Sequence, residues 1–383
     1  MGSKTNSKSQ PKTWRKVKLG EIMTTARVNF EKVKTSEYKR TGRLPIFDQG
    51  SDAIAGYTNN PKAEYRGKSP AILFGDHTLK LKIAEPPFAI GADGIQILEP
   101  NEDLLDRNFF YYALKGLKVR SYGYERHMKY LRELEIACPN ITDQKRIAEI
   151  LSAFDDKIEL NNKISRTLEQ MAQAIFKEWF ASSSVALAKE GELPKDWEAV
   201  DAEKILIFEK GVEPGSNSYS ITKKANFIPF YRVRDLEGKN GDTDVFINKE
   251  VANNKICKYN DVLISFDATV GRIKIGCSGA FSSGIRRVYS KDGFIKNSFI
   301  YFWLKTPYVQ NTILEHSSGT TILHAGSSIE FLKILFNKEI INKFQKTSEP
   351  IFNKILEIEN ENQKLSSLRD LLLPKLMNGE VRV

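Results

Sequence analysis

The sequence predicts an α+β protein in which two pseudo-repeated globular modules are separated by a long antiparallel two-helix coiled coil. Three observations predict this architecture. The chain has 383 residues, which exceeds a single typical core and favours two to three domains. A set of short motifs occurs twice in the same order. Each copy is followed by a long segment with the apolar spacing of a coiled-coil helix.

The repeat rests on framework residues that recur at a nearly constant distance. The offset drifts only from 183, between Trp14 and Trp197, to 198, between Leu134 and Leu332. Such a shared order over many weak matches is hard to obtain by chance, so the chain contains two copies of one module. Further matched pairs are Asp76 with Asp267, Gly94 with Gly284, Phe109 with Phe299, Gly123 with Gly319 and His127 with His324.

Each module mixes short strands with short helices. Runs of aliphatic and β-branched residues predict strands at 71–74, 262–264 and 272–275, and apolar periodicity predicts helical patches at 108–117 and 297–305. The predicted boundaries are a flexible tail (1–12), module 1 (13–141), a first long helix (142–181), a linker (182–196), module 2 (197–337) and a second long helix (338–383).

The two long helical segments carry an apolar residue at every third or fourth position. The first begins at an N-cap formed by Thr142 and Asp143 and contains no Gly or Pro up to residue 181. Helices of this length bury their apolar stripes by pairing, and antiparallel pairing is the simplest arrangement. Asn161 and Asn362 stand in the two seams, where a buried Asn fixes register. Pro350 is expected to kink or restart the second helix.

Charge and composition restrict the class of partner. The net charge is +10, which favours a polyanion such as nucleic acid. The three cysteines are far apart and only four histidines occur, so no metal site is expected. No apolar run reaches the roughly 20 residues of a membrane helix, and the polar start is not typical of a signal peptide. These features predict a cytoplasmic protein without a membrane partner.

No catalytic residue is predicted. Glu85-Pro86-Pro87-Phe88 imitates the Asn/Asp-Pro-Pro-aromatic motif of amino-methyltransferases, but Glu is one methylene too long and no donor-binding loop precedes it. The chain also lacks a GxxxxGK[ST] loop and the acidic motifs of metal-dependent nucleases. Two alternatives to a DNA-recognition protein stay open. One is a standalone DNA methyltransferase or nuclease with a duplicated DNA-binding domain, and the other is a coiled-coil interaction protein that does not bind DNA.

Recognition chemistry, in contrast, recurs in both modules. The loop at 121–129 combines aromatic side chains, a glycine and basic residues, and its counterpart lies at 317–324. Gly lets a backbone approach a phosphate closely, Thr and His bond phosphates or base edges, and Arg reads guanine through a bidentate pair. The candidate DNA-binding residues are Tyr122, Gly123, Tyr124, Arg126, His127, Lys129, Lys80 and Lys82 in module 1, and Gly319, Thr320, Thr321, His324, Arg272 and Arg286 in module 2.

The helical segments resemble those of the specificity subunit of type I DNA restriction–modification systems. The residues that carry the resemblance lie at 144–151, 157–162 and 168–176 in the first helix, and at 362–365 and 368–376 in the second. The resemblance extends over nearly the whole chain beyond residue 12, while the modules match through a sparse framework only.

This resemblance implies that each module is a target-recognition domain for one half of an asymmetric, bipartite DNA site, and that the helix pair sets the spacer. It implies a non-catalytic chain in a restriction endonuclease and adenine-N6 methyltransferase complex, with double-stranded DNA, two methylation subunits and restriction/motor subunits as partners. No cofactor is expected in this chain, because S-adenosylmethionine, ATP and Mg would belong to the partner subunits. The candidate positions for methylation-subunit docking and helix register are Asn161, Asn162, Met171, Phe176, Trp179, Asn362, Leu365, Leu368 and Leu372.

Overall fold

The computed structural model describes residues 14–383 except 28, 51, 93, 121–124, 182–192, 238–242 and 320–322. The predicted tail and most of the predicted linker therefore lie outside the described residues. The chain divides into two compact units. Unit 1 is Met1–Asp156 with Ser367–Val383, and unit 2 is Lys157–Ser366. Each unit holds one module together with parts of both long helices.

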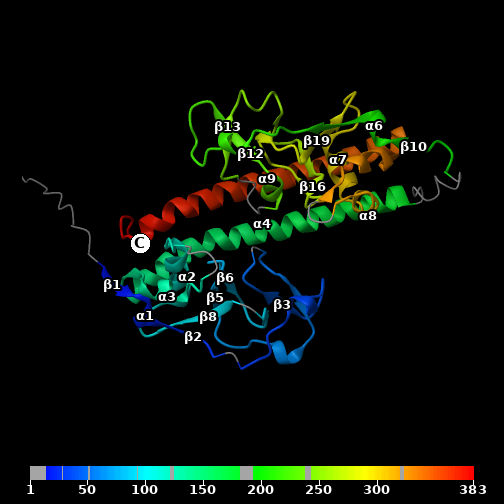
Figure 1. Ribbon diagram of the computed structural model, residues 1–383. Coiled ribbons are helices and arrows are strands. Elements are labelled where there is room, and N and C mark those ends of the chain that lie inside the picture. Colours follow the sequence, from blue (N-terminus) through cyan, green and yellow to red (C-terminus); the bar gives the residue numbers. More distant parts are fainter. Residues whose placement is uncertain are drawn as a thin grey trace, which may run out of the picture. The chain divides into compact units, whose positions relative to one another are not determined.

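Module 1 consists of short strands and helices that lead into the first long helix (Figure 1). These elements are β1 (Arg15–Lys18), α1 (Leu19–Ile22), β2 (Met23–Thr25), β3 (Leu44–Phe47), β4 (Gly56–Thr58), β5 (Ala71–Gly75), β6 (Leu81–Ala84), β7 (Ala89–Ile90), β8 (Ile95–Pro100), α2 (Arg107–Gly116), α3 (Met128–Glu133), β9 (Glu135–Cys138) and the long helix α4 (Ile141–Ala181).

A four-stranded antiparallel sheet in the order β2-β8-β5-β6 forms the centre of module 1. All five residues of β5 are buried, as expected for a continuous apolar run in a central strand. Ile72 and Phe74 of this strand share one hydrophobic cluster with Phe109 and Phe110 of α2. The helix therefore covers one face of the sheet, and the candidate loop of module 1 follows this helix in the chain.

Module 2 has an equivalent series of elements and leads into the second long helix. They are β10 (Glu198–Asp201), α6 (Ala202–Ile205), β11 (Leu206–Lys210), β12 (Phe227–Tyr231), β13 (Phe246–Asn248), β14 (Ile256–Cys257), β15 (Val262–Ser265), β16 (Asp267–Ala268), β17 (Ile273–Lys274), β18 (Gly279–Phe281), β19 (Ile285–Ser290), α7 (Asn297–Leu304), α8 (Pro307–Glu315), β20 (Leu323–His324), β21 (Lys333–Phe336) and the long helix α9 (Lys338–Met377).

The two modules share one topology, which confirms the repeat. The sheet β11-β19-β15-β17 of module 2 corresponds to β2-β8-β5-β6 of module 1. The parallel pair β12–β18 corresponds to the parallel pair β3–β7. The pair β10–β21 closes module 2 in the same way that β1–β9 closes module 1. The predicted α+β class is thus confirmed, with two β-rich domains and two long helices that pack together.

The pairing of α4 with α9 is antiparallel, as the apolar stripes predicted. Within unit 2, Phe176 packs edge-on against Phe344 with the ring centroids 5.1 Å apart, while Asn161 lies opposite Asn362. Because residue numbers fall along α9 as they rise along α4, the two helices run in opposite directions. Both helices are drawn as long unbroken ribbons in Figure 1.

Two details of the long helices differ from the predictions. The N-cap of α4 is Asn140, whose Oδ1 accepts the Asp143 N–H at 2.9 Å, so Thr142 and Asp143 lie inside the helix. The expected restart at Pro350 was wrong, because α9 continues through this residue. Pro350 lies on the exposed face, where water can hydrate the carbonyl of Lys346 that loses its helical partner.

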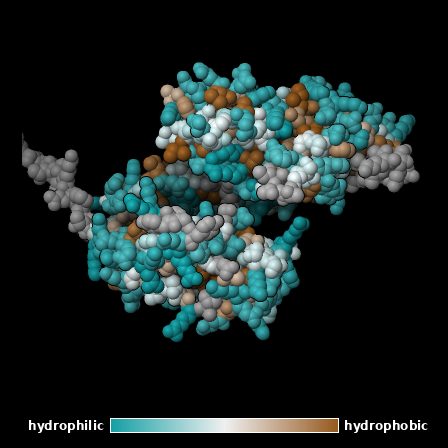
Figure 2. Space-filling view, viewed as in Figure 1, coloured by the Kyte–Doolittle hydropathy of each residue, from teal (hydrophilic) through white to brown (hydrophobic). Residues whose placement is uncertain are grey.

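The visible face of the molecule is mostly hydrophilic, with apolar residues in small separate groups (Figure 2). No helix among the described residues has the length and apolarity needed to cross a membrane. Within that same part of the chain, no three His, Cys, Asp or Glu side chains gather in a way that could hold a metal ion.

Candidate nucleic-acid interface

Asp76 holds the predicted recognition loop of module 1 against the end of β5. The His127 N–H donates to the carbonyl oxygen of Asp76 at 2.9 Å, and the Met128 N–H donates to its carboxylate at 2.7 Å. The Nδ1 atom of His127 lies 2.8 Å from the same carbonyl oxygen. Because a carbonyl oxygen only accepts, Nδ1 carries the proton. Asp76 is 4% exposed and His127 is fully buried, so α3 begins from a fixed position.

A hollow of about 390 Å³ lies beside this anchor, and three exposed cations, Arg126, Lys129 and Arg132, form part of its wall. The Lys129 ammonium lies 4.5 Å from the ring centroid of Tyr130 and 3.2 Å from a carboxylate oxygen of Glu125. Its contacts with Tyr130 and Glu125 raise the pKa of Lys129 above the ordinary value. Cations gathered around a concave surface attract a DNA backbone. The remaining lining residues are Thr25, Asp76, Gln96 and Met128.

Module 2 repeats the aspartate–histidine contact in an exposed form. Asp267 of β16 lies opposite His324 of β20, and the histidine Nδ1 is 2.7 Å from the aspartate Oδ1. The His324 side chain is 62% exposed, whereas its counterpart His127 is buried. Ser318 exchanges two backbone hydrogen bonds with His324, at 2.9 and 2.8 Å. This small sheet therefore presents an imidazole ring to solvent from a hydrogen-bonded strand.

The two candidate arginines of module 2 are held by protein groups. The Nη1 of Arg286 donates to the carbonyl oxygen of Ser283 at 2.5 Å. Burial lowers the pKa of Arg286 from the ordinary arginine value, and the nearby Asp267 opposes this shift. Arg272 forms an ion pair with Glu237, which neutralises its charge locally. Both side chains are thus fixed in advance, but the ion pair of Arg272 leaves Arg286 as the better candidate for a directional contact with an anion or a base.

The other candidate residues of the modules differ in their surroundings. Lys80 is exposed. The Lys82 side chain is 11% exposed, its Nζ donates to the Asp52 carbonyl oxygen at 2.6 Å, and burial lowers its pKa against the opposing effect of Asp48. His127 is buried, so we do not retain it among the proposed DNA contacts. Gly319 adopts a φ of +112°, which favours glycine. Tyr122, Gly123, Tyr124, Thr320 and Thr321 lie outside the described residues.

A chain of asparagine contacts joins the long helices in unit 2. The Nδ2 of Asn161 donates to Oδ1 of Asn362 at 2.9 Å, and the Nδ2 of Asn362 donates to Oδ1 of Asn162 at 3.1 Å. Asn161 and Asn362 are 1% and 0% exposed, so these amides are satisfied inside the seam. A paired polar contact of this kind disfavours shifted registers, because a shift would leave buried amides without partners.

The predicted docking residues divide between the buried seam and the exposed helix faces. Phe176 is buried, whereas Met171 and Leu368 are 52% and 49% exposed. Ala172 is buried next to the exposed Met171, so at this point of α4 the seam passes one position after the predicted residue. The physical reason is that a straight helix drifts against a seven-residue repeat. Trp179, Leu365 and Leu372 are half-buried.

Sequence reasoning missed Arg132 and Gln96, which line the hollow of module 1. It also missed that the recognition loop of module 1 is anchored on Asp76, the residue that follows β5. The repeat itself contained a signal for Gln96. The offset of 190 between Gly94 and Gly284 places Gln96 at the position of Arg286.

Comparisons with known proteins point to one family. The family model for the type I restriction modification DNA specificity domain matches residues 11–170. A protein of Methanocaldococcus jannaschii assigned as the specificity subunit of the MjaX type I restriction enzyme is 27% identical and covers 97% of this chain and 95% of its own. The HindI specificity subunit of Haemophilus influenzae is 25% identical over 83% of this chain and 85% of its own. The crystal structure of a type I S subunit from M. genitalium matches 98% of both chains with a TM-score of 0.53 and 20% identity, which shows the same fold.

Two homologous α+β modules on a pair of antiparallel helices, each with cationic and polar side chains at its surface, define the architecture of a two-module DNA-specificity protein. Residues 11–170 carry the DNA specificity domain of type I restriction–modification systems, and over most of its length the chain is similar to the specificity subunits of these systems. As such a subunit it gives a type I restriction enzyme its DNA specificity, and it works as one part of a larger complex.

Proposed function

We propose that each module reads one half of an asymmetric, bipartite DNA site. Module 1 would use the cationic hollow, and module 2 the surface around His324 and Arg286. The observation that carries this proposal is that one scaffold bears different side chains at equivalent positions. Gln96 stands where module 2 has Arg286, and His127 is buried where His324 is exposed. Different donors and acceptors select different base edges, so the two half-sequences should differ.

The helix pair would set the spacer between the half-sites and dock two methylation subunits. Support for docking comes from Met171 and Leu368, because exposed apolar side chains on a rigid helix are suited to a partner protein. In the cytoplasmic complex the methylation subunits would supply S-adenosylmethionine chemistry. Restriction/motor subunits would supply cleavage that depends on ATP and Mg. This chain would bind none of these cofactors.

A paired insertion tests the spacer. Four residues added next to Asn161, with four matching residues next to Asn362, lengthen the helix pair by about 6 Å at about 1.5 Å per residue. B-DNA rises about 3.4 Å per base pair, so the unread gap should grow by one or two base pairs while both half-sequences stay the same. Methylome sequencing of a strain that carries the variant measures the gap.

The control is the same insertion in α4 alone, which should disrupt the asparagine pairing and abolish modification. An active paired variant with an unchanged gap would show that the helices serve only as a docking platform.

A further inference from the structure

The residue before α7 in module 2 occupies the same place as the residue before α2 in module 1. In both modules a glutamine of the long helix accepts the N–H of that residue. Gln144 accepts the Asp106 N–H at 2.8 Å, and Gln345 accepts the Lys296 N–H at 2.6 Å. Asp106 and Lys296 are therefore structural equivalents of opposite charge.

The replacement of Asp106 by Lys296 removes the side-chain cap of the helix that follows. The Asp106 carboxylate accepts the Phe109 N–H at 2.9 Å and so caps α2. Lys296 cannot replace it, because an ammonium group has no acceptor, and no side chain in the described part of the molecule caps α7. The first N–H groups of a helix have no partner within the helix. The N-terminus of α7 thus lacks the carboxylate that its counterpart has.

A second charge difference accompanies the first. The Lys296 Nζ lies 2.6 Å from Oε2 of Glu349 on α9. Glu349 follows Gln345 by four residues, and the residue four after Gln144 is Ala148. Module 1 therefore combines an aspartate with an alanine where module 2 combines a lysine with a glutamate.

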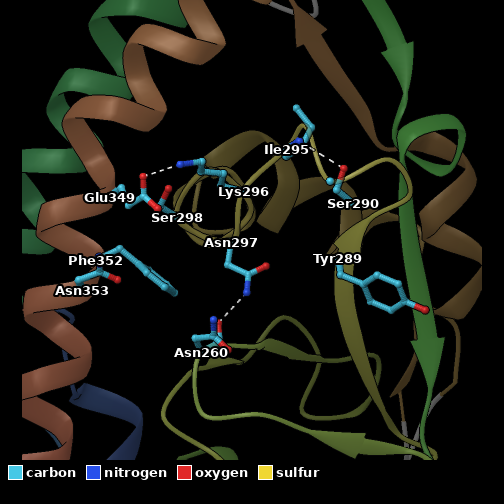
Figure 3. A pocket seen from close by; sticks show the side chains of 11 residues that line it. Asn260, Tyr289, Ser290, Ile295, Lys296, Asn297, Ser298, Glu349, Phe352 and Asn353 are labelled. Atoms are coloured by element: carbon cyan, nitrogen blue, oxygen red, sulfur yellow. Dashed lines mark hydrogen bonds and ion pairs between the residues drawn. The ribbon is translucent and has the colours of Figure 1, made fainter.

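A pocket of about 410 Å³ opens at the N-terminus of α7 (Figure 3). Ser298, the second residue of the helix, lines this pocket and is only 2% exposed. Its hydroxyl has no hydrogen-bond partner among the described residues. A buried hydroxyl that is left unpaired is unfavourable, so this group indicates a partner that the chain itself does not supply.

We propose that this pocket binds the carboxylate group of a ligand. The carboxylate would accept hydrogen bonds from the N-terminal N–H groups of α7 and from the Ser298 hydroxyl, with the Lys296 ammonium beside it. Helix N-termini favour anions, and Asp106 shows that the same scaffold accepts a carboxylate at this place. A phosphate dianion fits less well, because Glu349 in the wall would repel a second negative charge more strongly.

This site is separate from the proposed DNA surface of module 2. Tyr289 and Ser290, which line the pocket, are at the end of β19, whereas Arg286 is near its start. Ser290 follows Arg286 by four residues, which is about 13 Å at about 3.3 Å per residue. The pocket is therefore an additional site for a ligand other than the recognised bases.

Titration of the full chain with succinate tests the proposal. The measurement is the change of the Ser298 and Phe299 amide resonances at constant ionic strength. The wild-type protein should show saturable shifts. Ser298→Ala should weaken binding by about tenfold, since one charge-assisted hydrogen bond is lost, without lowering the unfolding midpoint of the free protein. The double variant Lys296→Asp/Glu349→Ala, which copies module 1, should lose binding and unfold at a higher temperature.

Equal succinate affinity in all three proteins would overturn the site, and tighter binding of inorganic phosphate than of succinate would overturn the carboxylate preference. A drop in the unfolding midpoint of free Ser298→Ala would show that the hydroxyl is structural and would also overturn the proposal. N-acetyl-aspartate amide identifies the source of the ligand. Tighter binding of this compound than of succinate supports an aspartate side chain of a partner protein, and the reverse order supports a free dicarboxylate.

Discussion

His127 of module 1 and His324 of module 2 occupy equivalent places beside an aspartate, yet only His324 is exposed to solvent. His127 bonds the backbone carbonyl of Asp76, whereas His324 bonds the carboxylate of Asp267. The same residue type therefore anchors a loop in one module and forms part of the surface in the other. The two modules share one backbone fold, but matched residues in them have different structural roles.

At the N-termini of helices α2 and α7, too, a framework contact is the same in both modules while a charged residue differs. Gln144 and Gln345 make equivalent contacts to the residue before the helix, while that residue changes from Asp106 to Lys296. Framework contacts are thus kept and charged positions are varied. This division suits the proposed reading of two half-sequences with one fold, because specificity depends on side chains presented from a fixed backbone.

The largest expected difference between the two modules is the loss of stability when the aspartate beside each histidine is replaced. Asp76→Ala leaves the Met128 N–H without its buried acceptor and should lower the free energy of unfolding by about 3 kcal/mol. Asp267→Ala removes a contact of an exposed histidine and should cost less than about 1 kcal/mol. Urea unfolding measures both values. Equal losses in the two variants would contradict the assignment of a buried anchor to module 1 alone.

The next effect concerns DNA discrimination. Arg126→Ala should weaken discrimination at one half-site by about 2 kcal/mol if a base contact is lost, and His324→Ala should do so at the other half-site. Competition binding with duplexes altered in one half at a time measures the effect for each half. Should both variants weaken both halves to the same extent, the two residues would be general phosphate contacts.

The smallest expected difference concerns the residues that precede α2 and α7, and it is again a difference in the free energy of unfolding. Asp106→Ala removes the cap of α2 and should lower the free energy of unfolding by about 1 kcal/mol. Lys296→Ala removes only a half-exposed ion pair with Glu349 and should change it by less than half of that amount. Thermal and urea unfolding of the two variants gives the comparison. A larger loss in Lys296→Ala than in Asp106→Ala would mean that the ion pair, and not a cap, stabilises this position.

The features that repeat in the sequence could be predicted, because a repeat and an apolar period are local patterns. They located the two modules, the long helices and the seam positions of Asn161 and Asn362. The burial of His127 could not be predicted in this way, since it depends on a contact with Asp76, 51 residues earlier. Met171, one of the predicted docking or register positions, is exposed next to the buried Ala172, because a small drift of helical phase decides which neighbour faces inward.

The most direct test of the central claim is the DNA motif read by a chain with module 1 in both positions. Residues 197–337 would be replaced by 13–141, and the methylated motif would be determined by methylome sequencing. An antiparallel helix pair has approximate two-fold symmetry, so identical modules should read the same half-sequence on opposite strands. We therefore expect the asymmetric motif to become a palindrome built from one of the two original half-sequences. An active variant that still modifies the original asymmetric motif would show that the modules do not each read one half.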